Sequence, residues 1–128
     1  MSNLVSNSGV VASDVSGVGT AREGSNATNY GGDKAIFGFG YTSGRVGITN
    51  LVNNSGVVAS DVSGVGTARE HPGATNYGGD KAIFGFGNSG SVTGITNLVN
   101  NSGVIQANVS AVGTARSDAG AAGYSISA

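Results

Sequence analysis

One segment of about 47 residues occurs three times, and this repetition constrains the fold more than any other feature of the sequence. The copies open with "NLVSNSGVVASDVSGVGTARE", "NLVNNSGVVASDVSGVGTARE" and "NLVNNSGVIQANVSAVGTARS". The first two copies differ at about ten positions, and the third diverges more. Repeats of this length occur in propeller blades and in helical arrays. We therefore treat the chain as a single repeat domain, 1–128, with copies at 3–49, 50–96 and 97–128.

The local pattern within each copy favours strands over helices. Apolar residues do not recur at helical spacing, and the abundant Gly, Ser, Asn and Val form helices poorly. Short β-branched runs are instead separated by Asn- and Gly-rich turns. The sequence therefore predicts an all-β fold of antiparallel, four-stranded propeller blades. In the second copy the four strands are expected at "ITNLV" (48–52), "GVVASDV" (56–62), "ATNYGG" (74–79) and "KAIFGFG" (81–87).

Alternation within "KAIFGFG" predicts two different faces on that strand. Ala82, Phe84 and Phe86 are expected on one face, because successive side chains of a strand point to opposite sides. Glycines occupy much of the other face, where a neighbouring sheet can approach closely.

Composition excludes several classes of protein. Apolar residues make up 38% and charged residues 10%, with 24 glycines, which is close to low complexity. The apolar residues nevertheless recur at fixed places, which argues against disorder. A net charge of −1 gives no basis for nucleic-acid binding. No apolar run is long enough for a membrane helix, and the start "MSNLVSNSG" lacks the features of a signal peptide. We therefore expect a protein without a signal peptide that neither binds nucleic acid nor inserts into a membrane. The absence of cysteine excludes disulfides.

The segment "GTAREHPGATNYGGDKAIFGFG" resembles the kelch repeat in its order of residues. An Arg (Arg69), a small residue (Ala74), an aromatic (Tyr77), a Gly doublet and a strand ending in glycines follow one another as in kelch blades. Nearly the whole chain is also similar to Gly-rich repeats of structural and tail-associated proteins of tailed phages, especially marine ones, in which "TNLVSNTGVV…D…GVGTAR" alternates with "YGGDKAIFGYG". That resemblance implies association with a virion and no catalytic residues. Recent duplication or deliberate construction also accounts for copies this similar.

Three arginines recur in "GTAR", at Arg22, Arg69 and Arg116. A ring of arginines could bind an anionic group such as an acidic sugar. Alternatively, each arginine bridges neighbouring blades through an Asp or through backbone carbonyls. The kelch-like pattern favours the bridging role.

Recurring aromatic residues also have two interpretations. Tyr30, Tyr77 and Tyr124 occur in all three copies, whereas Phe37 and Phe84 occur in two. Such rings can stack on sugars, as in lectins. Their positions in strands favour packing between blades, where each contributes about 1.5–3 kcal/mol when buried.

The titratable residues do not indicate catalysis or metal binding. Asp33 and Asp80 each precede a Lys and are typical of turns, and nothing has the dense acidic spacing that Ca²⁺ requires. His71, the only histidine, lies in a variable stretch with no visible nucleophile or partner. We expect no enzyme activity, no cofactor and no metal.

The positions that differ between copies are candidates for binding, because variable loops lie on the rims of propellers. The main hypothesis is a non-enzymatic virion structural or adhesion protein, such as part of a tail fibre, with other virion proteins or a host surface glycan as partners. It would be located in the virion if phage-derived, and otherwise soluble. The alternative is a carbohydrate-binding, lectin-like propeller, natural or constructed. The rim candidates are Gly24, Ser25, Asn26, Tyr41, Arg45, His71 and Asn88.

A count of strands predicts self-association. The chain holds about eleven expected strands, whereas propellers close with about four to eight blades of four strands. Unclosed blades expose strand edges and apolar faces. We therefore expect an obligate homo-oligomer that completes the ring, with a dimer favoured over a trimer. The segment from Tyr124 through "SISA" is expected to join the start of a neighbouring chain.

Overall fold

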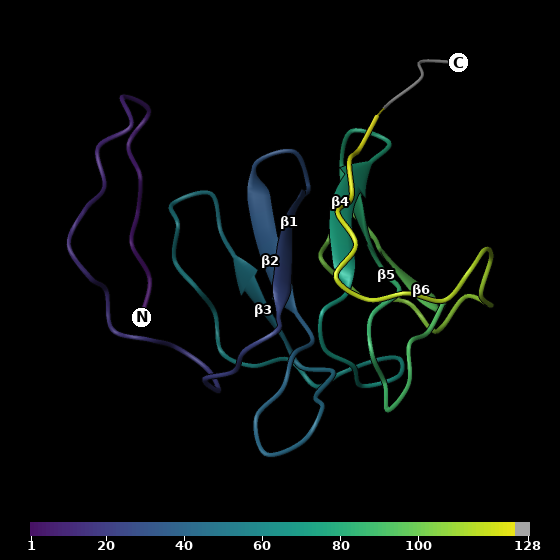
Figure 1. Ribbon diagram of the computed structural model, residues 1–128. Coiled ribbons are helices and arrows are strands. Elements are labelled where there is room, and N and C mark those ends of the chain that lie inside the picture. The colour runs from purple at the N-terminus through teal and green to yellow at the C-terminus, as the bar shows by residue number, and fades with distance from the viewer. Residues whose placement is uncertain (125–128) are drawn as a thin grey trace.

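The structure, a computed structural model that describes residues 1–124, contains strands and no helix in that range (Figure 1). The prediction of an all-β fold is therefore confirmed. Two antiparallel three-stranded sheets follow one another along the chain, each with its strands in sequence order. The strands are β1 (Asn26–Tyr30), β2 (Lys34–Gly38) and β3 (Thr49–Val52) in the first sheet, and β4 (Gly73–Tyr77), β5 (Lys81–Gly85) and β6 (Thr96–Val99) in the second.

Tight glycine turns set the register of each sheet. In the first sheet Tyr30 pairs with Lys34, so only three residues connect β1 to β2. Gly31 and Gly32 of this turn have φ angles of 61° and 81°, which residues other than glycine rarely adopt. The same letters recur around the β4–β5 turn, which pairs Tyr77 with Lys81 in the same way.

The segment expected to form a fourth strand lies beside β3 without forming a regular ladder. Only isolated bridges join them, at Val52↔Val58 and Thr49↔Val62. Between these bridges the outer segment contains one residue more than β3, which is the arrangement of a β-bulge. The bulge interrupts the hydrogen-bond ladder, so residues 56–62 do not form a continuous strand. In the second sheet Ile105 and Val109 bridge β6 with the same offset.

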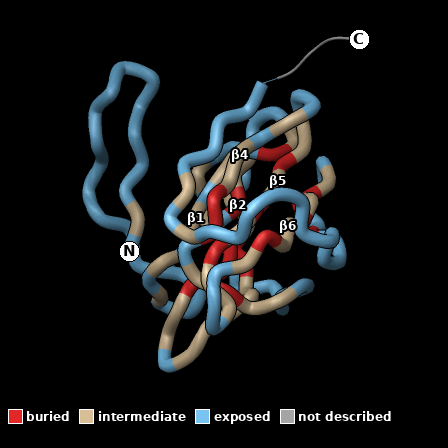
Figure 2. The backbone as a smooth tube through the Cα atoms, turned by 45° about the vertical axis from the view of Figure 1, so that its right-hand side comes forward, coloured by how far each residue is buried: buried red, intermediate tan, exposed pale blue. Residues whose placement is uncertain are grey.

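An N-terminal hairpin precedes the first sheet. Residues 2–15 fold back on themselves through bridges at Ser2↔Val15 and Val5↔Val11. The hairpin stands apart from both sheets in Figures 1 and 2, and almost all of it is exposed. Leu4 lies against Gly56 of the turn after β3, but the valines of the hairpin are exposed because, within residues 1–124, no strand pairs with residues 3–5 as β2 pairs with β3.

The hydrophobic core lies between the two sheets (Figure 2, red). Phe84 of β5 points toward the first sheet, where a Cβ added at Gly38 would lie 2.9 Å from the Phe84 ring. Glycine on β2 therefore allows the close approach of sheets that the alternation predicts. The placement of Phe86 on the same strand face as Phe84 was wrong, because β5 ends at Gly85 and Phe86 has a φ of 63°. The buried apolar residues are Tyr30, Ile36, Phe39, Ala82, Phe84, Val99 and Ile105.

Candidate functional site

Arg69 lies in the middle of the interface between the sheets. Its guanidinium is stacked 3.9 Å from the centroid of the Phe39 ring, and Phe39 packs edge-on against Phe84 with 5.3 Å between centroids. Arg69 Nη1 donates to the Thr67 carbonyl at 3.1 Å, and Nη2 donates to the Phe84 carbonyl at 3.3 Å. Burial lowers the pKa of Arg69 to about 10, because water no longer solvates its charge. The side chain thus connects the first sheet to the second.

The other two arginines of the series occupy less buried versions of this position. Half-buried Arg22 donates from Nε to the Phe39 carbonyl at 2.7 Å, and desolvation lowers its pKa while Asp61 opposes that effect. Exposed Arg116 stacks 3.8 Å from the centroid of the Phe86 ring, as Arg69 does on Phe39. All three are therefore held by backbone carbonyls or aromatic rings of the chain.

A second contact joins neighbouring copies, and sequence reasoning missed it. Thr20 donates its amide to Asp61 Oδ2 at 3.0 Å and its hydroxyl to the same oxygen at 2.6 Å. Thr67 makes the equivalent contact with Asn108: its amide donates to Asn108 Oδ1 at 3.1 Å, and its hydroxyl accepts from Asn108 Nδ2 at 2.8 Å. We call this contact, between a "GT" threonine and the Asp or Asn found 41 residues later, the clasp. Its recurrence at a fixed spacing was the signal available in the sequence.

An asparagine supports each clasp from within its own copy. Asn50 donates to Asp61 Oδ1 at 2.8 Å, and Asn97 donates to Asn108 Oδ1 at 3.0 Å. Hydrogen bonds from Thr20 and Asn50 lower the pKa of the Asp61 carboxyl below its ordinary value.

The predicted aromatic packing is found only in part. Tyr30 and Phe84 are buried, and Tyr77 is half-buried. The packing prediction was wrong for Phe37, which is 40% exposed. Tyr124 is 79% exposed in the single chain; its expected contact with a neighbouring chain stays a prediction, and the remaining residues of that segment, 125–128, lie outside the described range. Phe37 points away from the second sheet and lines an open cavity of about 460 Å³ between the first sheet and the N-terminal segment. Tyr124 lacks the cover that the Gly103 segment gives to Tyr30.

The variable loops lie together along one edge of the molecule, which we call the rim. The amide of His71 donates to the Gly24 carbonyl at 2.7 Å, and the amide of Asp118 donates to the His71 carbonyl at 3.3 Å. These three residues, one from each copy, have φ angles of 59°, 52° and 56°. The longer variable loops, which begin at Tyr41 and Asn88, lie beside these residues because of the bridges Glu23↔Tyr41 and Glu70↔Asn88. Of the remaining rim candidates, Asn26 donates to the Pro72 carbonyl, Ser25 lies between Gly24 and Asn26, and Arg45 pairs with Glu70.

One ion pair and one histidine–carboxylate contact give the rim its chemistry. Arg45 Nη2 lies 3.0 Å from Glu70 Oε1, and His71 Nδ1 lies 3.0 Å from Asp118 Oδ1. Asp118 is the partner of His71 that sequence reasoning did not find, although both occupy the same place in their copies. Charged groups of both signs on adjacent loops can bind a polar ligand through hydrogen bonds. Within residues 1–124, no three His, Asp or Glu side chains are grouped so that they could hold a metal ion.

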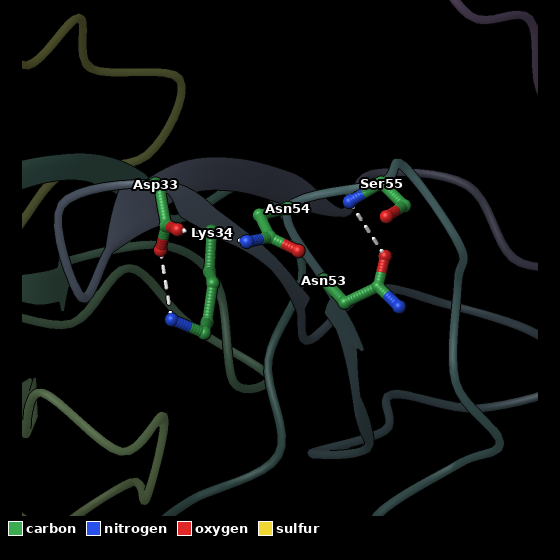
Figure 3. Close-up of polar contacts among 5 residues, drawn as sticks. All are labelled: Asp33, Lys34, Asn53, Asn54 and Ser55. Carbon is green, nitrogen blue, oxygen red and sulfur yellow. Dashed lines mark hydrogen bonds and ion pairs between the residues drawn. The ribbon is translucent and has the colours of Figure 1, made fainter.

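The repeated Asp–Lys pairs are parts of turns. Asp33 Oδ1 lies 2.7 Å from Lys34 Nζ, and Asp33 Oδ2 accepts from Asn54 Nδ2 at 3.1 Å (Figure 3). Asn53 accepts from the Ser55 amide in the adjoining turn at 2.9 Å. The hydrogen bonds from Lys34 and Asn54 lower the pKa of Asp33, and the one from Asn54 ties the β1–β2 turn to the turn after β3.

Comparison with known proteins gives this chain no family. No family model matches it, and no curated protein matches it. Residues 1–124 contain no helix with the length and hydropathy needed to span a membrane.

Proposed function

We propose that this chain is a non-enzymatic structural or adhesion protein of a tailed-phage virion, built from kelch-like blades. The observation that carries the proposal is the use of the repeated polar groups within the chain: buried Arg69 stacks on Phe39 of the preceding copy, and each of the two clasps joins one copy to the next. Repeat arrays are stabilised by such nearest-neighbour interfaces. Because these polar side chains contact other copies of the repeat, they support an architectural role for the repeated residues.

The blade proposal rests on the arrangement of the strands. In each sheet an outer segment bridges the last strand, at 58–62 beside β3 and at 105–109 beside β6, which gives four antiparallel segments. β1 packs beside β4, so the first strands of the two sheets are neighbours. Propeller blades place their first strands side by side around a central axis. The hairpin 2–15 corresponds to the third and fourth strands of a further blade, and association of copies would complete the ring.

Immunogold electron microscopy tests the assignment to a virion. Antibodies raised against the purified chain are applied to particles purified from the source that encodes it. We expect gold label on the particles at a fixed location, with no label from pre-immune serum. Detection of the chain in infected-cell lysate, together with unlabelled particles, contradicts the proposal.

A second candidate function, carbohydrate binding, is favoured by the gathering of the variable loops on one rim. Arg45 supplies positive charge there, Glu70 and Asp118 supply negative charge, and His71 adds a ring that can form hydrogen bonds. Glycan-array binding of the wild-type chain and of Arg45→Ala with His71→Ala tests this function. Binding that the double variant loses supports a lectin-like rim. Failure of the wild-type chain to bind any glycan on the array counts against it.

A further inference from the structure

The clasp is formed with nearly the same geometry at both places where one copy meets the next. In each, a glycine with positive φ precedes the threonine: Gly19 at 81° and Gly66 at 92°. A Cβ added at Gly19 would overlap the Asp61 carboxylate, and one added at Gly66 would overlap Asn108. Glycine therefore lets the threonine loop lie directly against its acceptor.

The third copy presents the threonine half of a clasp with nothing against it. Gly113 has a φ of 86°, matching its two equivalents, but a Cβ added there would meet no atom within 4 Å. In the described part of the chain, the amide and hydroxyl of Thr114 have no hydrogen-bond acceptor. Val112 is 82% exposed, whereas its equivalents Val18 and Val65 are 48% and 44% exposed.

The N-terminal hairpin presents the acceptor half. Asp14 Oδ1 accepts from Asn3 Nδ2 at 2.7 Å, as Asp61 accepts from Asn50. No threonine among residues 1–124 bonds to Asp14, so its carboxylate is free to accept an amide and a hydroxyl. The hairpin and the second sheet lie on opposite sides of the first sheet (Figure 1), which prevents Asp14 and Thr114 of one molecule from meeting.

We propose that Thr114 of one molecule forms a clasp with Asp14 of a second copy of this chain. This inference rests on the proposed repeat array, because it extends the contact between copies to a contact between molecules. The donors of Thr114 and the acceptor oxygens of Asp14 are complementary, and docking of the hairpin covers Val112. The contact is head-to-tail, since different surfaces of the two molecules meet.

Light scattering across a dilution series measures self-association, and the test compares the wild-type aspartate at position 14 with alanine and with asparagine. Asp14→Ala removes the acceptor and weakens self-association about tenfold or more, the effect of losing hydrogen bonds to a charged group. Asp14→Asn keeps self-association within about threefold of wild type, because the Asn108 amide makes both hydrogen bonds of a clasp, with its Nδ2 donating to the threonine hydroxyl. Ser13→Ala, one residue away, is the matched control and leaves association unchanged.

Three outcomes overturn the proposal: a wild-type chain that is monomeric throughout the series, an Asp14→Ala variant that associates like wild type, and an Asp14→Asn variant that dissociates like Asp14→Ala. Circular dichroism of each variant establishes that it is folded. A Thr114→Val variant, altered in the third copy rather than the hairpin, provides an independent measurement and is expected to weaken association.

Disulfide trapping locates the contact, and because the chain has no native cysteine, only the introduced cysteines can form a disulfide. Asp14→Cys and Thr114→Cys chains are mixed and oxidised, and we expect a disulfide-linked dimer of the two. Neither variant alone should give that dimer, and Ser8→Cys at the hairpin tip mixed with Thr114→Cys should not cross-link. Self-association without a 14–114 cross-link refutes the clasp and leaves the virion proposal intact. If the 14–114 cross-link forms but antibodies against the chain label no virus particles, the clasp is supported and the virion proposal is contradicted.

Discussion

At the scale of single residues, the burial and contacts of the same side chain depend on which residues of the neighbouring copy pack against it. Arg69 is buried between two sheets, whereas Arg116 stacks on its phenylalanine with its other face in solvent. A buried guanidinium loses solvation, so it is stable only where rings and carbonyls replace water. The energetic importance of the "GTAR" arginine therefore depends on its position along the chain.

Arg69→Ala is expected to destabilise the fold by about 1–3 kcal/mol, because it leaves the Phe84 carbonyl without its donor and removes the stack on Phe39. Arg116→Ala is the matched control and should cost under about 1 kcal/mol, since an exposed stack contributes little. Urea unfolding followed by tyrosine fluorescence measures both. Equal losses from the two variants would contradict this assignment.

Asp61→Asn is expected to keep the neutral-pH melting temperature and to reduce the loss of stability in acid. The pKa of Asp61 is lowered in the folded chain from its ordinary 3.8, so the unfolded chain binds more protons below that pH. Stability from this carboxylate is therefore complete above the unfolded pKa and is lost as pH falls through the folded pKa. The asparagine keeps the clasp, as Asn108 does, without titrating.

Thermal melts from about pH 6 down to about pH 2 test this expectation, with Asp61→Ala as control. The alanine variant loses the clasp and should melt lower at every pH. Asp33 and Asp80, whose pKa values are also lowered, remain in all variants and give the residual acid sensitivity. An asparagine variant with the full wild-type acid sensitivity would exclude Asp61 as a contributor.

At the scale of strands, glycine positions decide how closely the sheets approach. Gly38 of β2 faces the second sheet, and the Phe84 ring occupies the space that a side chain there would take. Its equivalent on β5, Gly85, has the Thr96 methyl 3.2 Å from where a Cβ would be. Strands of identical sequence thus differ in how well they tolerate a side chain at this glycine, because in β2 the other sheet packs directly on it.

Gly38→Ala is therefore expected to cost about 1–3 kcal/mol, since the new methyl overlaps a buried ring that Phe39 holds in place. Gly85→Ala should be milder, because the Thr96 methyl can shift by a few tenths of an ångström. Gly44→Ala, which meets no atom within 4 Å, controls for the general effect of replacing glycine. Chemical denaturation gives the order, and a Gly85 variant less stable than the Gly38 variant would contradict the packing described.

At the scale of the whole molecule, the valine that ends the "NLV" segment becomes more buried from one copy to the next. Val5 of the hairpin is exposed, Val52 of β3 is half-buried, and Val99 of β6 is fully buried. The three have the same place in their copies, so intrinsic preference does not account for the trend. The segments that pack against each position from elsewhere in the chain therefore decide its burial.

Hydrogen exchange should follow this order. We expect amides of the hairpin 2–15 to exchange at least about tenfold faster than those of 96–109 in the Asp14→Ala chain, diluted until it is monomeric, because few buried contacts oppose opening of the hairpin. The two segments have similar sequences, which makes each the control for the other. Mass spectrometry of peptic fragments measures both, and equal protection would contradict the exposed position of the hairpin.

The sequence alone predicted the all-β class, the sites of β1–β6 and the glycine turns, because these depend on local propensity and on alternation along one strand. It also placed the variable loops at 24–26 and 71–73, since differences between copies are visible without coordinates. The tertiary structure alone revealed the clasp, the pairing of His71 with Asp118, and the contrast between buried Phe84 and exposed Phe37. The letters around each phenylalanine are the same in both copies, so its burial depends on which other segment packs against it. That packing joins residues about 40 to 50 positions apart, beyond the reach of any local pattern.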